Sequence, residues 1–140
     1  MKLRVLLPVA ALLMLKAGLA ATGDEKTGDD KKELDKLQGE WTLVSREVKG
    51  KKFDETAKKN KLTIKGDQWI LNPGPTATIK IDTSKDPKWI DLTKYSPGIY
   101  KLEGDTLTIC RRTSGTERPK EFKTTKDDTN VVIVYKRASK

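Results

Sequence analysis

Histidine is absent from the chain of 140 residues, and cysteine occurs once, at Cys110. Without histidine there is no imidazole to act as a general base, to activate a serine or to bind a metal ion. A single cysteine forms neither an internal disulfide nor a thiolate metal cage. Glycine-rich loops of the P-loop or dinucleotide-binding kind are also missing. We therefore expect no cofactor and no metal site.

The composition still allows a pair of carboxylates to act as general acid and general base, as in glycosidases. Most of the acidic residues, however, lie beside lysines or at predicted turns, for example Asp67, Asp82 and Asp105. Forming a turn is the ordinary role of Asp at such positions. We therefore interpret the chain as a non-enzymatic protein, and keep an acidic pair in a pocket as the enzymatic alternative.

Long apolar runs are missing beyond the start of the chain. Residues 5–15 are apolar, they follow the basic residues Lys2 and Arg4, and the small residues "AGLAA" come next. These three parts predict a secretory signal peptide over residues 1–20, with cleavage after Ala20. The apolar run is short of the roughly 20 residues that span a bilayer, so we expect no stable membrane insertion after cleavage. The expected location is periplasmic or extracellular, with an uncleaved anchor as the alternative.

Acidic residues are fewer than basic ones, 20 against 29, so the formal net charge is +9. The signal segment contributes +3 and residues 21–37 contribute −2, so the chain from Gln38 onward carries about +8. A body with this charge favours anionic partners such as acidic envelope polymers. Lysine outnumbers arginine 23 to 6, which favours solvated surface charge over forked phosphate recognition. Export argues against nucleic acid as the partner.

Residues 21–32 are polar and lack an apolar period, which predicts a flexible lead-in. The domain is expected to cover residues 33–140. The spacing of Asp30 and Glu33 is typical of a capping box, and predicts a short helix that stops at Gly39.

After Gly39 the apolar residues alternate with polar ones in short segments that are separated by turns. "KGKK" is predicted as a turn, and residues 54–60 as one helical turn that crosses an end of a barrel. The expected strands and hairpins cover residues 39–48, 61–71, 76–82, 88–93, 99–111 and 130–137. About eight short strands without a long helix indicate an antiparallel sandwich or barrel.

The aromatic residues lie on predicted strands. Trp69 and Tyr100 either line a pocket for a sugar or an apolar ligand, or pack in the core, and core packing is favoured for each residue taken singly. Among the three tryptophans, Trp89 is expected to be the most exposed, because charged residues flank it.

Arg111 and Cys110 are neighbours on one predicted strand. Arg111 shares a face with Leu107 and Ile109, so it either points into a barrel end, where it suits an anionic ligand, or reaches out to solvent at the rim. Cys110 is interpreted as a small buried hydrophobic residue, with an exposed thiol that pairs with another molecule as the alternative.

Six segments, taken in order, resemble a family of small exported proteins of unknown function that is abundant in planctomycete bacteria. They cover residues 34–137 and read "LQGEWTLVS", "LTIKGDQW", "DPKWIDLT", "GIYKLEGDTLTIC", "RPKEF" and "VVIVYKR". The resemblance implies a lipocalin-like barrel in which Gly39 and Trp41 enter the first strand. It also implies that a basic residue of the last strand, Lys136 or Arg137, packs over Trp41 as a structural closure. It brings no catalytic or ligand-binding residues.

We therefore predict an all-β, lipocalin-like antiparallel barrel of about eight strands, preceded by a short helix. The first functional hypothesis is an exported binding protein that holds a small apolar or anionic molecule in a barrel cup, in contact with Trp69, Tyr100 and Arg111. The second is an envelope interaction protein whose basic surface binds an anionic polymer or a partner protein.

Overall fold

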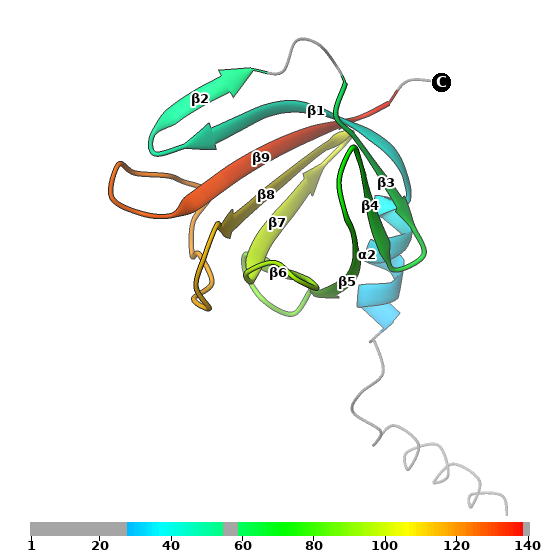
Figure 1. Cartoon of the computed structure of the whole chain (residues 1–140). Helices are drawn as coiled ribbons and strands as arrows, with labels where there is room; N and C mark the ends of the chain where they lie inside the picture. The colour runs from blue at the N-terminus through cyan, green and yellow to red at the C-terminus, as the bar shows by residue number, and fades with distance from the viewer. Residues whose placement is uncertain (1–27, 55–58, 139–140) are drawn as a thin grey trace, which may run out of the picture.

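The computed structural model describes residues 28–54 and 59–138, which form one helix and nine strands (Figure 1). The helix is α2 (Gly28–Leu37). The strands are β1 (Gly39–Val48), β2 (Lys51–Asp54), β3 (Lys61–Lys65), β4 (Gln68–Asn72), β5 (Thr76–Asp82), β6 (Lys88–Leu92), β7 (Gly98–Glu103), β8 (Thr106–Arg112) and β9 (Asn130–Arg137).

The strands close into an antiparallel barrel. β3 to β9 pair in sequence order, β1 pairs with β3, and β9 returns to pair with the other edge of β1. Eight strands thus form the barrel, while β2 pairs only with β1 and lies beside it. This architecture confirms the predicted lipocalin-like all-β barrel.

Both predicted hairpins are present, because their turns contain the residue that the backbone needs. β3–β4 and β7–β8 turn at Gly66 (φ 62°) and Gly104 (φ 61°). Glycine adopts this left-handed conformation without the steric cost of a Cβ.

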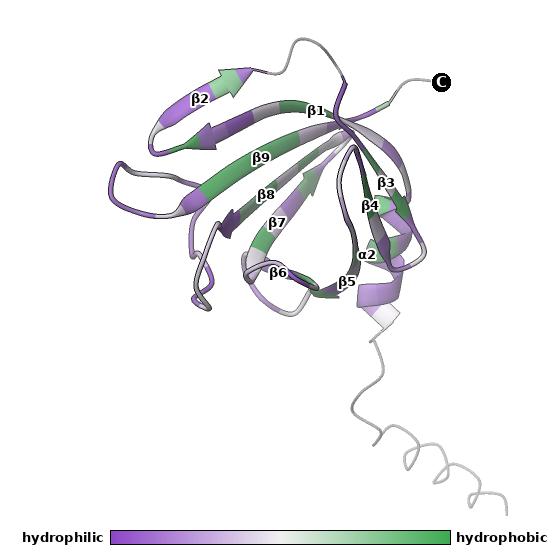
Figure 2. Cartoon of the chain, viewed as in Figure 1, coloured by the Kyte–Doolittle hydropathy of each residue, from purple (hydrophilic) through white to green (hydrophobic). Residues whose placement is uncertain are grey.

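The alternation of apolar residues places one face of each strand in the interior. Figure 2 shows the result along β8 and β9, which are mostly hydrophobic, and along β2, which is mostly hydrophilic. The core cluster comprises Leu34, Leu37, Trp41, Leu43, Leu62, Ile64, Trp69, Ala77, Ile79, Ile81, Ile90, Leu92, Tyr100, Leu107, Ile109, Val131, Ile133 and Tyr135. Its own side chains therefore occupy much of the barrel interior, as an eight-stranded barrel permits.

α2 closes one end of the barrel. Its apolar residues Leu34 and Leu37 join the core cluster, and the Trp41 indole Nε1 donates a 2.9 Å hydrogen bond to the Leu37 carbonyl. Among the described residues, no helix is long and apolar enough to cross a membrane.

The start of α2 differs from the prediction. The helix begins at Gly28, so residues 28–32, which were assigned to the flexible lead-in, are helical. The carboxylate of Asp30 accepts hydrogen bonds from the Thr83 backbone N (2.8 Å) and from the Thr83 Oγ1 (2.7 Å). This anchor comes from a distant part of the chain, and a local capping rule does not reveal it. Residues 1–27, including the predicted signal peptide, lie outside the described residues.

β2 was also not predicted, because "KGKK" was interpreted entirely as a turn. Only Lys49 and Gly50 form the turn, with φ angles of 50° and 78°, and Lys51 already pairs with Val48. All four residues of β2 are exposed, so the strand carries no apolar alternation that a sequence pattern could detect. Most of the helical turn predicted over residues 54–60 lies outside the described residues, and Asp54 itself is in β2.

A second, smaller apolar cluster lies on the outer side of the barrel wall. It comprises Ile99, Cys110 and Val132, and Trp89 and Phe122 pack against it. Phe122 belongs to the β8–β9 loop (residues 113–129), which covers this part of the wall. Cys110 is fully buried there, which confirms the interpretation of Cys110 as a buried hydrophobic residue.

Arg118 attaches the β8–β9 loop to the wall. Its guanidinium donates to both carboxylate oxygens of Asp91 (2.9 and 3.3 Å) and to the Gly98 carbonyl (2.8 Å). It also lies 4.1 Å from the centroid of the Trp89 ring, and Lys85 lies 4.7 Å from the same centroid. Trp89 is thus partly buried, and it is the most exposed of the three tryptophans, as expected.

Candidate functional site

The end of the barrel away from α2 carries the candidate site. β1 begins beside α2 and ends at Val48, which lies opposite Val131 of β9, and Val131 lies opposite Arg111 of β8. These three residues therefore mark the far end of the barrel. We call this end the mouth, and define the mouth cluster as the side chains of Arg46, Tyr95, Arg111 and Tyr135.

Arg111 points into the mouth. It alternates with Leu107 and Ile109, which both belong to the core cluster, and the centre of its guanidinium lies 4.5 Å from the centroid of the Tyr95 ring. Burial lowers the pKa of the Arg111 guanidinium; Tyr95 and Tyr135 oppose this shift, and the charge of Arg46 adds to it. The Arg111 cation is therefore held in a partly desolvated place, next to a second cation.

Arg46 reaches the same place because β1 contains a bulge. The register shifts between Leu43 and Ser45, so that Arg46 lies opposite Ile133, a core residue. Paired residues of antiparallel strands place their side chains on the same face, so Arg46 faces the mouth. Simple alternation from Trp41 would have placed Arg46 on the outer face.

Arg46 and Arg111 have no acidic partner within residues 28–54 and 59–138. Among the ion pairs of the described residues, none includes Arg46 or Arg111. The hydrogen bond recorded for the Arg111 guanidinium goes to the Arg112 carbonyl, at 3.2 Å. The charge of Arg46, whose side chain is exposed, acts on the partly desolvated Arg111 guanidinium, and an anion beside both would offset the repulsion between them.

Tyr135 supplies a phenol beside the two arginines. Burial raises the pKa of Tyr135 to about 12, although Arg111 and Arg46 act in the opposite direction. The hydroxyl is therefore protonated at neutral pH and available as a donor. Within the described part of the chain it has no hydrogen-bond partner. The Tyr135 ring packs edge to face against Trp69, with centroids 5.9 Å apart and planes at 83°.

The three predicted contact residues lie in different surroundings. Arg111 lies in the mouth cluster, whereas Trp69 is buried in the core, where its ring packs against Tyr135 of that cluster. Tyr100 is instead engaged with α2, because its hydroxyl donates a 3.2 Å hydrogen bond to the Glu33 carboxylate. Burial and the nearby Glu33 carboxylate raise the pKa of Tyr100 well above its ordinary value, which keeps its hydroxyl protonated.

Sequence reasoning did not select Arg46, Tyr95 or Tyr135 as contact residues. Tyr135 alternates with Ile133 on the last strand, so its inward orientation was available from the pattern. Tyr95 lies in the β6–β7 loop and packs against the core from there, which no strand period indicates.

The predicted structural closure lies at the opposite end, and Arg137 forms it. The centre of its guanidinium lies 4.3 Å from the centroid of the Trp41 ring, and it donates to the carbonyls of Gln38 (2.9 Å) and Lys36 (2.8 Å). Gly39 has a φ of 119° there, and a Cβ on it would lie 3.4 Å from Arg137. Lys136, the other candidate, is exposed on the neighbouring strand position.

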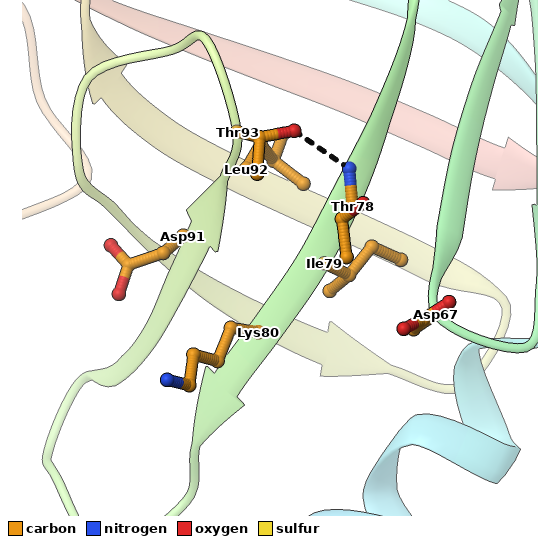
Figure 3. A pocket seen from close by; sticks show the side chains of 7 residues that line it. All are labelled: Asp67, Thr78, Ile79, Lys80, Asp91, Leu92 and Thr93. Carbon is orange, nitrogen blue, oxygen red and sulfur yellow. Dashed lines mark hydrogen bonds between the residues drawn. The ribbon is translucent and has the colours of Figure 1, made fainter.

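A shallow cleft with a volume of about 400 Å³ is lined by residues of β5, of β6 with the following Thr93, and by Asp67 of the β3–β4 turn (Figure 3). Asp67 and Asp91 lie at opposite ends of it, with Ile79 and Lys80 between them. Asp91 is engaged by Arg118, and the Thr78 backbone N donates a 2.9 Å hydrogen bond to the Thr93 hydroxyl. The cleft therefore does not present two facing carboxylates.

A second hollow, of about 390 Å³, lies under the β8–β9 loop. Its lining is polar and mixes both signs of charge, with Arg112 and Glu117 3.7 Å apart. Among the described residues, the buried Arg112 Nε and Asn130 Oδ1 have no hydrogen-bond partner there. Within residues 28–54 and 59–138, no group of three His, Cys, Asp or Glu side chains is placed to hold a metal ion.

Comparison with known proteins yields no relative, because no family model, no curated protein and no solved structure matches the chain.

Proposed function

We propose that this chain is a non-enzymatic binding protein that takes a small molecule with an acidic group at the barrel mouth. The observation that carries the proposal is a pair of arginines, Arg46 and Arg111, that both face the mouth, where the charge of one acts on the other. Neither arginine is in an ion pair with a described residue. Guanidinium groups bind carboxylate or phosphate through forked, charge-assisted hydrogen bonds.

The neighbours of the two arginines fit such a ligand. The protonated hydroxyl of Tyr135 is a third donor directed to the same region. Val48 lies on the same face of β1 as Arg46 and is partly buried against the core, so it offers apolar contact to the body of the ligand. A molecule with one acidic group and an apolar body therefore suits the mouth better than a simple inorganic ion.

The direct experiment is a titration with medium-chain aliphatic carboxylic acids and with the alcohols of the same chain length, followed by tryptophan fluorescence. The acids are expected to bind and the alcohols are not. The variant Arg111→Gln should bind the acids more weakly by about tenfold or more, because it removes charged donors.

Arg112→Gln is the matched control, because Arg112 is the next residue of β8 and faces outward. Equal loss in both variants would assign the acids to the outer surface, and equal binding of acids and alcohols would overturn the role of the arginines. Native mass spectrometry of protein purified gently from its own source would then give the mass of the natural ligand.

A second proposal follows from the net charge of about +8 on the chain from Gln38 onward, most of it carried by lysine. A basic surface of this kind would bind an anionic envelope polymer by long-range attraction. Retention on an immobilised polyanion should then fade as the salt concentration rises from about 0.05 to 0.5 M, because the screening length shrinks. Retention that is insensitive to salt would remove this proposal.

We also propose, from the sequence of residues 1–20, that the protein is exported to the periplasm or the exterior. Edman sequencing of the mature protein should begin at Ala21. The resemblance to the planctomycete family of small exported proteins also stays a proposal, and rests on the ordered segments alone.

A further inference from the structure

The β1–β2 hairpin has two chemically different faces. Arg46 lies opposite Phe53, and Val48 lies opposite Lys51, so these four residues share one face. Because Arg46 faces the mouth, we call this the mouth-side face. It contains two cations and two apolar residues, and no acid.

The opposite face of the hairpin holds its acidic residues. Glu47 lies opposite Lys52, and Ser45 lies opposite Asp54. Asp54 is 3.9 Å from the Lys52 ammonium, and Glu47 accepts a 2.7 Å hydrogen bond from the Thr124 hydroxyl. The two acids of the hairpin are thus engaged on the outer face, whereas Arg46 and Lys51 are in no ion pair of the described residues.

Phe53 is the most exposed large hydrophobic residue of the described chain, with 54% of its surface accessible. The residues before it are basic, since Lys51 and Lys52 precede it and Lys49 stands at the turn, whereas Asp54 follows it on the opposite face. Figure 1 shows the hairpin extending beside the barrel on the side away from α2. Burial of this ring against a partner would remove its apolar surface from water, which is favourable.

We propose that the mouth-side face of the β1–β2 hairpin docks on an anionic lipid surface, with Phe53 in the headgroup region and Lys51 against the acidic headgroups. Aromatic rings partition into this interfacial region, and lysines near an anionic leaflet are attracted to it. The chemistry required of the partner is an acidic, apolar-backed surface, and an anionic bilayer provides both features at once.

A lipid surface fits this face better than a protein partner does. A stable protein interface buries about 800 Å² on each side with complementary shape. The exposed face offers one aromatic ring and a few basic residues on a strand of four residues. Docking in this orientation would turn the barrel mouth toward the lipid, because Arg46 belongs both to the mouth cluster and to this face.

The test is co-sedimentation of the protein with phosphatidylcholine vesicles, with and without about 30% phosphatidylglycerol as the anionic lipid. The wild-type chain is expected to bind the anionic vesicles and not the neutral ones. Lys51→Glu should weaken that binding on the order of tenfold, because it reverses one charge at the lipid surface.

The chain offers a matched control for each change. Lys52→Glu makes the same change of charge on the same strand but on the opposite face, and should weaken binding much less. Phe53→Ala should weaken binding several-fold, whereas Val44→Ala, at the other exposed large hydrophobic residue, should not. The four positions are exposed, and equal thermal midpoints will show that the variants are folded.

Equal losses for Lys51→Glu and Lys52→Glu would overturn the proposal, because they would show attraction by net charge without a preferred face. Binding that is equal for neutral and anionic vesicles, or absent for both, would overturn it as well. The variants distinguish failure of the lipid-docking proposal from failure of the ligand-binding proposal. Lys51→Glu should leave binding of a soluble medium-chain acid intact, and Arg111→Gln should leave vesicle binding largely intact.

Discussion

The ring of Trp69 meets the ring of Tyr135 edge to face across the inside of the barrel. Trp69 is on β4 and Tyr135 is on β9, two strands that are not hydrogen-bonded neighbours. The contact therefore joins the apolar core to the mouth cluster, since the Tyr135 phenol interacts with Arg111 and Arg46. The buried ring of Trp69 is therefore in direct contact with Tyr135, a member of the mouth cluster.

The first prediction concerns the Tyr135 hydroxyl. Tyr135→Phe keeps the ring against Trp69 and removes a donor that has no partner among the described residues. The free energy of unfolding should change by no more than about 0.5 kcal/mol, because no internal hydrogen bond is lost. The affinity for a medium-chain acid should fall about fivefold. Urea denaturation and the fluorescence titration measure the two quantities, and a stability loss without an affinity loss would make Tyr135 a purely structural residue.

The second prediction concerns the closure at the other end. Arg137→Ala removes the cation over the Trp41 ring and the donors to two carbonyls that belong to the α2–β1 junction. The free energy of unfolding should fall by about 2 kcal/mol. Lys136→Ala is the matched control on the next position of β9, and should cost much less because Lys136 is exposed. Chemical denaturation of both variants gives the comparison.

The barrel itself was predictable, because its information is local. Alternation of apolar residues, and the glycines at the hairpin tips, place β3, β4, β7 and β8 where they were expected. The pairing of β1 with β9 that closes the barrel joins residues more than 80 positions apart, and no single segment predicts it.

The mouth cluster was only partly predictable, because its geometry depends on one irregularity. The inward orientation of Arg111 follows from the period of β8. The orientation of Arg46 depends on the bulge between Leu43 and Ser45, and nothing in the residues "LVS" announces an extra residue there. Asp30 gives the same lesson, because its partner Thr83 is more than 50 positions away.

The third prediction is a pH dependence that originates in Glu33. Burial tends to raise the pKa of this carboxyl, but the hydrogen bond and charge of Lys88 and the hydrogen bond from Tyr100 outweigh it, so that the pKa lies below its ordinary 4.5. A lowered folded-state pKa means that the native state binds this proton less readily than the unfolded chain does. Its contribution is thus complete above pH 4.5 and is lost as the pH falls through the lowered value.

Glu33→Gln tests this dependence directly. The variant should be less stable than the wild type at neutral pH, because Lys88 loses its 2.8 Å partner. The difference in stability should shrink as the pH falls below 4.5, where the wild-type carboxyl also becomes neutral. Thermal midpoints measured from neutral to acidic pH give the curve. A constant difference across that range would place the effect of the substitution in packing and not in the charge of Glu33.

The fourth prediction concerns the thiol under the β8–β9 loop. Cys110 is fully buried, and burial raises the pKa of its thiol to about 11, so little thiolate exists at neutral pH. Two barriers, access and ionisation, should therefore make its reaction with an aromatic disulfide reagent very slow in the native protein and fast in denaturant. Arg118→Ala should accelerate the native reaction, because it removes the guanidinium that ties the loop to Asp91 and Gly98. Lys120→Ala, an exposed position of the same loop, is the control, and equal acceleration in both variants would show that Arg118 does not hold the loop over Cys110.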